Sequence, residues 1–133
     1  RATELNIIMG CGHYVPAAHP NGIGSKTKDE LTERMVRDIV HGIGDTNIRP
    51  GIIGELGNIW PITEIQQRLL ESAADAHKET NLPILIHPGS DDRSPLKIID
   101  ILANCGVAPE AIIMGHLDSG SNRLLHGIRH IWV

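Results

Sequence analysis

The chain has 133 residues, of which 41% are hydrophobic and 21% are charged, and its formal net charge is −4. These values are typical of a single globular domain, and the acidic balance argues against nucleic acid or an anionic membrane as a partner. No apolar run reaches the ~18 residues that a membrane-spanning helix needs, and no leader pattern is visible. With only two cysteines, Cys11 and Cys105, we expect a cytoplasmic protein without a disulfide framework.

Four short apolar runs rich in isoleucine predict β-strands. They lie at residues 5–10, 51–55, 82–87 and 111–116. Continuous apolar runs of this length are typical of parallel strands, so we expect both faces of each strand to be covered.

Amphipathic patterns between these runs predict helices. The first helix is expected at 27–41, where Thr27 and Glu30 have the spacing of a capping box. The second is expected at 63–80 and begins with the same kind of box. Apolar residues recur at three- and four-residue spacing in both, which predicts one buried face on each helix.

A third helix is expected from Ser94, as the N-cap, with Pro95 as the first helical residue and Gly106 closing the helix. The resulting alternation of strands and helices predicts an α/β fold with parallel strands and right-handed crossovers. An open doubly wound sheet is the competing arrangement, but the loop after the first strand lacks the glycine pattern of a phosphate-binding turn.

Three of the predicted strands end in a residue that can bind a metal, namely Glu55, His87 and His116. These residues are 32 and 29 positions apart, close to the ~31 residues per unit of an eight-unit barrel. Strand alternation places each on the same face as the residue two positions before it. Because chemistry in parallel α/β folds sits at the carboxyl ends of the strands, we expect the three side chains to converge.

Two imidazoles and a carboxylate form a coherent ligand set for Zn²⁺ or a similar divalent ion. A carboxylate can also bridge two ions, and a water bound there has a pKa of about 7. A cation accounts for the inward placement of Glu55 at the end of an apolar strand. A single histidine at a strand end is usually an ordinary polar residue, whereas three matched strand ends favour a metal site.

Other polar residues are expected on the same rim. We predict that His13, Tyr14 and Arg93 contact the substrate, with Arg93 facing an anionic group, although a solvated loop arginine is the competing interpretation. Asp118 either orients a metal ligand or caps a loop.

Several motifs together resemble the phosphotriesterase-related family of the amidohydrolase superfamily. They are GIIGELG followed by WPITE, then LPILIHPG, RSPLKIIDIL and IMGHLD, and the early NIIMGCGHYV resembles the third-strand region of that family. The resemblance covers residues 3–118. It implies that residues 1–118 form part of a (β/α)₈ TIM barrel, from about strand 3 to strand 6, and that 119–133 are a divergent C-terminal tail.

The resemblance also implies a chemistry. It assigns Glu55 as the bridging ligand of a two-zinc centre, with His87 and His116 as further ligands. The expected reaction is hydrolysis of a small amide or ester, with N-acyl amino compounds such as N-acetyltaurine as candidate substrates.

Two elements of the family pattern are absent from the sequence: the His-x-His pair of the first strand and the aspartate base of the eighth. We therefore expect the chain to be a partial barrel that is marginally stable and has little or no hydrolase activity alone, with no catalytic base among its residues. Its exposed barrel edges favour self-association.

Two alternatives remain at this stage. A metal-dependent deoxyribonuclease of the TatD-like kind uses a similar series of glutamate and histidines, but its fifth strand usually ends in His-Ser-Arg rather than in the HPG of this chain. A non-catalytic truncated protein that acts through a partner is the second.

Overall fold

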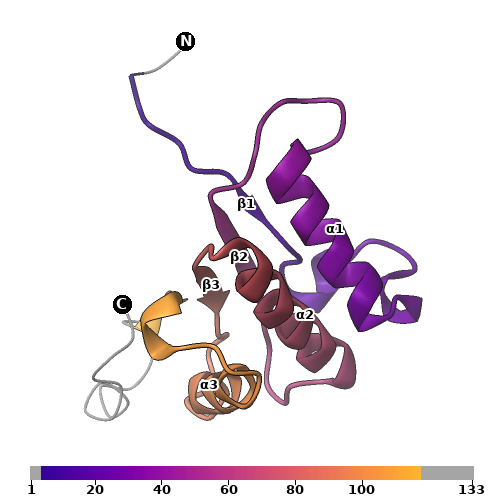
Figure 1. Cartoon of the computed structure of the whole chain (residues 1–133). Coiled ribbons are helices and arrows are strands. Elements are labelled where there is room, and N and C mark those ends of the chain that lie inside the picture. Colours follow the sequence, from indigo (N-terminus) through magenta and orange to yellow (C-terminus); the bar gives the residue numbers. More distant parts are fainter. Residues whose placement is uncertain (1–3, 118–133) are drawn as a thin grey trace.

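Four parallel strands alternate with three α-helices in the computed structural model, which describes residues 4–117 (Figure 1). The strands lie in one sheet in the order β1 (Gly10–Cys11), β2 (Ile52–Gly57), β3 (Ile84–His87) and β4 (Ile112–Met114). The connecting helices are α1 (Lys28–His41), α2 (Glu64–Thr80) and α3 (Ser94–Asn104). This order confirms the predicted α/β fold with parallel strands. Within 4–117, no helix combines the length and the apolar character needed to cross a membrane.

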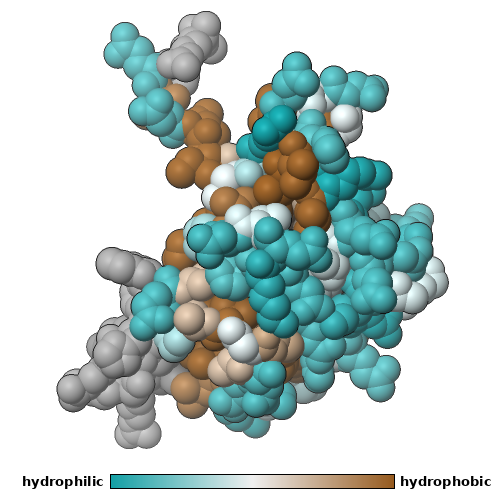
Figure 2. Space-filling view, in the orientation of Figure 1, coloured by the Kyte–Doolittle hydropathy of each residue, from teal (hydrophilic) through white to brown (hydrophobic). Residues whose placement is uncertain are grey.

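The first strand is much shorter than predicted. β1 comprises only Gly10–Cys11, and the segment before it leaves the sheet as an extended arm (Figure 1). Leu5, Ile7 and Ile8 are exposed on this arm, which contributes hydrophobic surface in Figure 2. The predicted strand at 5–10 is wrong over most of its length, because apolar residues form a strand only where a neighbouring strand completes the ladder.

The two helices with capping boxes begin where the sequence predicts. Oγ1 of Thr27 accepts a hydrogen bond from the backbone N–H of Glu30 at 3.2 Å, and the carboxylate of Glu30 accepts one from the N–H of Thr27 at 2.8 Å. Thr63 and Gln66 form the same reciprocal pair at the start of α2. Each box satisfies two backbone donors that the helix itself leaves unpaired.

The start of α3 differs from the prediction by one residue. Ser94 is the first helical residue and Arg93 is the N-cap. Asp91 is the reason, because its side chain accepts from the N–H of Arg93 at 2.9 Å and its carbonyl oxygen accepts from the N–H of Ser94 at 3.0 Å. The turn into α3 is therefore built on Asp91, and the predicted N-cap at Ser94 is wrong.

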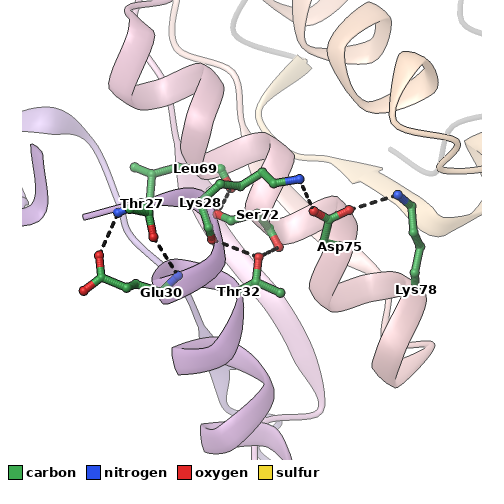
Figure 3. Close-up of polar contacts among 8 residues, drawn as sticks. All are labelled: Thr27, Lys28, Glu30, Thr32, Leu69, Ser72, Asp75 and Lys78. Atoms are coloured by element: carbon green, nitrogen blue, oxygen red, sulfur yellow. Dashed lines mark hydrogen bonds and ion pairs between the residues drawn. The ribbon is translucent and has the colours of Figure 1, made fainter. Parts of the chain in front are cut away.

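Helices α1 and α2 lie side by side and are joined by polar contacts (Figure 3). Lys28 on α1 and Lys78 on α2 both pair with the carboxylate of Asp75. Oγ1 of Thr32 donates to the carbonyl oxygen of Ser72 at 3.3 Å across the interface. These contacts hold the two helices in register and leave their apolar sides for packing on the sheet.

The apolar core lies between the sheet and its helices. Ile84 and Ile86 on β3 are fully buried, whereas the alternate residues Leu85 and His87 are partly exposed, as is Ile113 on β4. The expectation that both strand faces are covered is therefore wrong for the described part of the chain. Its four strands form an open sheet, so the second face lacks the side-chain layers that opposite strands supply in a closed barrel.

Candidate metal centre

A bulge in β2 turns Glu55 towards the second face of the sheet. Ile53 pairs with Ile84 and Leu56 pairs with Ile86, so β2 has an extra residue between these pairs. Ile53 and Leu56 are both buried in the core, whereas Glu55 is partly exposed. The extra residue breaks the alternation of the strand. The prediction that Glu55 shares a face with Ile53 is therefore wrong.

Gly54 permits this bulge. Its φ is +133°, and a Cβ at this position would lie 2.3 Å from the carbonyl oxygen of Leu85. Only glycine tolerates both the conformation and the close approach. β2 continues to Gly57, beyond the predicted end at Glu55, so the carboxylate leaves the strand from within the bulge rather than from the strand tip.

Two histidines approach Glu55 from the neighbouring strands. His87 is the last residue of β3, and its Nδ1 lies 3.9 Å from Oε1 of Glu55. His116 follows the end of β4, and its Nε2 lies 3.3 Å from the same oxygen. His116 was predicted to share a face with Met114, but Met114 is buried in the core. β4 has already ended, and the left-handed conformation of His116, with φ of 60°, redirects its side chain towards Glu55.

The three side chains converge on one point. Glu55, His87 and His116 each offer a ligand atom, and these atoms all lie within 4.8 Å of one another. The two imidazole rings are 4.8 Å apart at an interplanar angle of 74°. Both histidines border a hollow of about 320 Å³, which Asn58 and Ile59 also line.

The surroundings of this cluster fit a cation. Nδ1 of His87 is buried and has no hydrogen-bond partner within residues 4–117, since Oε1 of Glu55 at 3.9 Å is beyond hydrogen-bond range. A buried polar atom without a partner is costly. An ion among two imidazole nitrogens and a carboxylate oxygen would satisfy this atom with ligand types that Zn²⁺ prefers.

The two predicted substrate contacts after β1 lie in different surroundings. The ring of Tyr14 is 5.3 Å from the ring of His87, beside the cluster. His13 lines a separate hollow together with Arg34 of α1. Burial lowers the pKa of His13, and the positive charges of His19 and Arg34 lower it further. The structure therefore brings Tyr14, but not His13, to the cluster.

Arg93 lies in the loop that leads from β3 to α3. Its Nε and Nη2 donate to Asp91 at 2.9 and 2.8 Å, and its guanidinium carbon lies 4.8 Å from the ring centroid of Trp60. Hydrogen bonds from Arg93 lower the pKa of Asp91 to about 2. These contacts hold Arg93 between the loops after β2 and β3, and its substrate role stays a prediction. Asp118 lies outside the described residues.

Asn58 is a site residue that the sequence reasoning missed. It is 2% exposed, and its Nδ2 donates to the carbonyl oxygens of Leu56 at 3.1 Å and His87 at 3.4 Å. The only available signal was a polar residue directly after an apolar strand. That signal is equally typical of a surface turn, so it does not indicate burial.

Parallel strands linked by helices, with a Glu–His–His cluster at their carboxyl ends, define a segment of a (β/α)₈ barrel on the face where such barrels carry their chemistry. The sequence profile of the Phosphotriesterase family matches residues 1–127. The chain belongs to this family, which confirms the resemblance seen in its motifs.

Relatives with assigned names match most of the chain. The N-acetyltaurine hydrolase of Xenopus tropicalis is 41% identical over 116 residues, which are 87% of this chain and 33% of that protein. The human protein of the same name is 39% identical over 116 residues, with the same shares. The phosphotriesterase-related protein of Nematostella vectensis is 41% identical over 117 residues, 88% of this chain and 33% of its own length. The chain spans about a third of the length of the curated relatives it matches.

Two solved structures share the fold. The phosphotriesterase homology protein of Escherichia coli, solved with phosphate in its active site, superposes with a TM-score of 0.79 and 31% identity over 84% of this chain and 39% of that one. A resiniferatoxin-binding protein from Rhodobacter sphaeroides gives a TM-score of 0.80 and 25% identity over 84% and 31% of the two chains. These similarities confirm that the described strands form part of a barrel.

Proposed function

We propose that this protein is a metal-dependent hydrolase and that Glu55, His87 and His116 hold its divalent cation. The observation that carries the proposal is the convergence of three ligand atoms within 4.8 Å at one end of a parallel sheet. The buried Nδ1 of His87, which has no hydrogen-bond partner among the described residues, supports it, as does membership of the Phosphotriesterase family. Zn²⁺ is the ion that this donor set favours.

When bound by these residues, a divalent cation would act as a Lewis acid that lowers the pKa of water towards about 7 and polarises a carbonyl group. Glu55 would offset part of the positive charge of the bound ion, and its carboxylate is the group that a two-zinc centre would share. His87 and His116 are ligands carried by the ends of neighbouring strands, so they are held near their binding positions in advance. Tyr14, whose ring lies 5.3 Å from that of His87, is the proposed substrate contact beside the cluster.

The proposed substrate is a small amide or ester. N-acyl amino compounds such as N-acetyltaurine are the first candidates, because relatives at 37–41% identity carry the name N-acetyltaurine hydrolase. Arg93 is the proposed contact for an anionic end of such a substrate, and His13 is proposed to contact the substrate further along the rim. The proposal includes a cytoplasmic location, which the free thiols of Cys11 and Cys105 support.

Three protein ligands suffice for one ion but not for a two-zinc centre. We therefore propose that residues 1–118 supply one side of such a centre, with 119–133 as a separate tail. On this basis we expect the chain alone to have little or no hydrolase activity. Within residues 4–117, the edge strands β1 and β4 each pair with a strand on one side only, which favours self-association.

The test compares Zn²⁺ content and N-acetyltaurine hydrolysis before and after treatment of the purified chain with a chelator. We expect bound Zn²⁺ that is lost on chelation and regained on addition of the metal, and any hydrolysis by the chain should follow the metal content. A metal-free chain that takes up no divalent cation would contradict the proposed site. Turnover that is indifferent to the chelator would contradict metal dependence.

A further inference from the structure

Asn58 is almost fully buried beside the candidate metal centre. It directly follows β2, is 2% exposed, and lines the same hollow as His87 and His116. A buried side-chain amide needs partners for its two donor hydrogens. For Asn58 both partners belong to the strands that carry the cluster, since Nδ2 donates to Leu56 O at 3.1 Å and to His87 O at 3.4 Å.

The backbone of Asn58 adds another link to the same strand end. Its N–H donates to the carbonyl oxygen of His87 at 2.9 Å, so backbone and side chain converge on one acceptor. The chain after His87 then passes closely over Asn58, because a Cβ at Gly89 would lie 2.7 Å from the Asn58 carbonyl oxygen. Asn58 is therefore fixed tightly to the segment that carries His87.

The bulge explains why β2 and β3 need this link. Regular pairing is interrupted between Ile53 and Leu56 and resumes only just before β3 ends at His87. Glu55 lies inside the interruption, so the ladder alone does not set its position relative to His87. The amide of Asn58 joins Leu56, the neighbour of Glu55, directly to His87.

We propose that Asn58 is a positioning residue for the metal centre, whose amide holds the Glu55 bulge and the His87 strand end at the separation that a shared cation requires. This inference rests on the proposed metal-binding function. Loss of a residue that hydrogen-bonds to a metal ligand weakens metal binding by ~10–100-fold. We expect about 10-fold for Asn58, the lower end of that range, because it acts on the backbone of His87 rather than on the imidazole.

The test measures Co²⁺ binding by the full chain, from the visible absorption spectrum and from competition with a chromophoric chelator. Asn58→Leu keeps much of the side-chain volume and removes both amide donors, whereas Asn58→Ser keeps one hydroxyl donor. Gln66→Met is the matched control. Gln66 is also a buried amide, at 1% exposed, but it donates to the carbonyl oxygen of Ile59 and not to the strand that carries His87.

We expect Co²⁺ affinity to fall about 10-fold in Asn58→Leu and less in Asn58→Ser, with shifted absorption bands, while Gln66→Met binds like the wild type. Wild-type affinity and spectrum in Asn58→Leu, or an equal loss in Gln66→Met, would overturn the positioning role and leave the metal site intact. A wild-type chain that binds no Co²⁺ would overturn both proposals. If circular dichroism shows that Asn58→Leu does not fold, Asn58→Ser decides, and wild-type affinity in that variant rejects the role.

Discussion

Two regions of the molecule differ in how their polar groups are paired. They are the helical layer of α1 and α2, and the rim at the carboxyl ends of β2, β3 and β4. In the layer, partners lie close at hand: Asp75 pairs with two lysines, and Thr32 donates to two carbonyl oxygens. At the rim, His87 has a buried nitrogen without a hydrogen-bond partner in the described part of the chain, and His116 has a left-handed backbone conformation. Because folded proteins retain such features mainly at functional sites, this contrast supports the proposed metal centre at the rim.

Gly54→Ala should have the largest effect of the substitutions proposed, because it should disrupt the bulge that places Glu55 at the rim. The added methyl group would lie 2.3 Å from the carbonyl oxygen of Leu85, at a φ of +133°, so the bulge must rearrange. We expect a loss of about 3 kcal/mol or more in the free energy of unfolding, measured with denaturant, together with loss of Zn²⁺ binding. Gly24→Ala is the control, because a Cβ there meets no atom within 4 Å. Equal stability of the two variants would show that the bulge does not depend on Gly54.

Thr63→Ala should lower the stability of the helical layer without changing metal binding at the rim. It removes the side chain that accepts from the N–H of Gln66 in the capping box of α2. We expect a cost of about 1 kcal/mol in denaturant unfolding, with unchanged Zn²⁺ affinity. Glu79→Ala, at an exposed position of the same helix, serves as the control. A large fall in Zn²⁺ affinity in Thr63→Ala would remove the distinction between the two regions.

Asp75→Asn should have the smallest effect. The hydrogen bond from Lys28 and, to a smaller extent, the one from Lys78 lower the pKa of Asp75 below its usual value. The folded state therefore binds a proton less readily than the unfolded state. The stabilisation is present above about pH 4 and is lost as the pH falls through the folded-state pKa. We expect at most about 1 kcal/mol at neutral pH.

Thermal unfolding of Asp75→Asn against the wild type from pH 7 to pH 2 checks this prediction. The difference between the two should shrink as the pH falls. Glu79→Gln, an exposed substitution on the same helix, is the control. A difference that grows on acidification would contradict the assigned ion pairs.

The features that were predictable from the sequence rest on local signals. The capping boxes of Thr27 and Thr63 depend on residues three positions apart, and they set the starts of α1 and α2. The isoleucine-rich runs identified the region of each strand. Glu55, His87 and His116 stood out because each is a polar residue closing an apolar run.

The features that were missed depend on contacts between distant parts of the chain. The bulge at Glu55 follows from the pairing of β2 with β3, and the exposure of the arm at 5–9 follows from the lack of a described strand beside it. Asn58 is buried only because the end of β3 lies against it. Patterns of nearby residues carry no information about such contacts.

The most direct test of the metal centre is titration of the metal-free chain with Zn²⁺, followed by zinc X-ray absorption to identify the bound ligands. We expect two imidazole nitrogens and a carboxylate oxygen at about 2.0–2.2 Å. Glu55→Gln should weaken Zn²⁺ binding by more than ~100-fold, the largest loss typical of residues that only hydrogen-bond to a metal ligand. Glu79→Gln should leave Zn²⁺ binding unchanged. Zinc bound equally tightly by Glu55→Gln, or a ligand shell without histidine, would contradict the site at Glu55, His87 and His116.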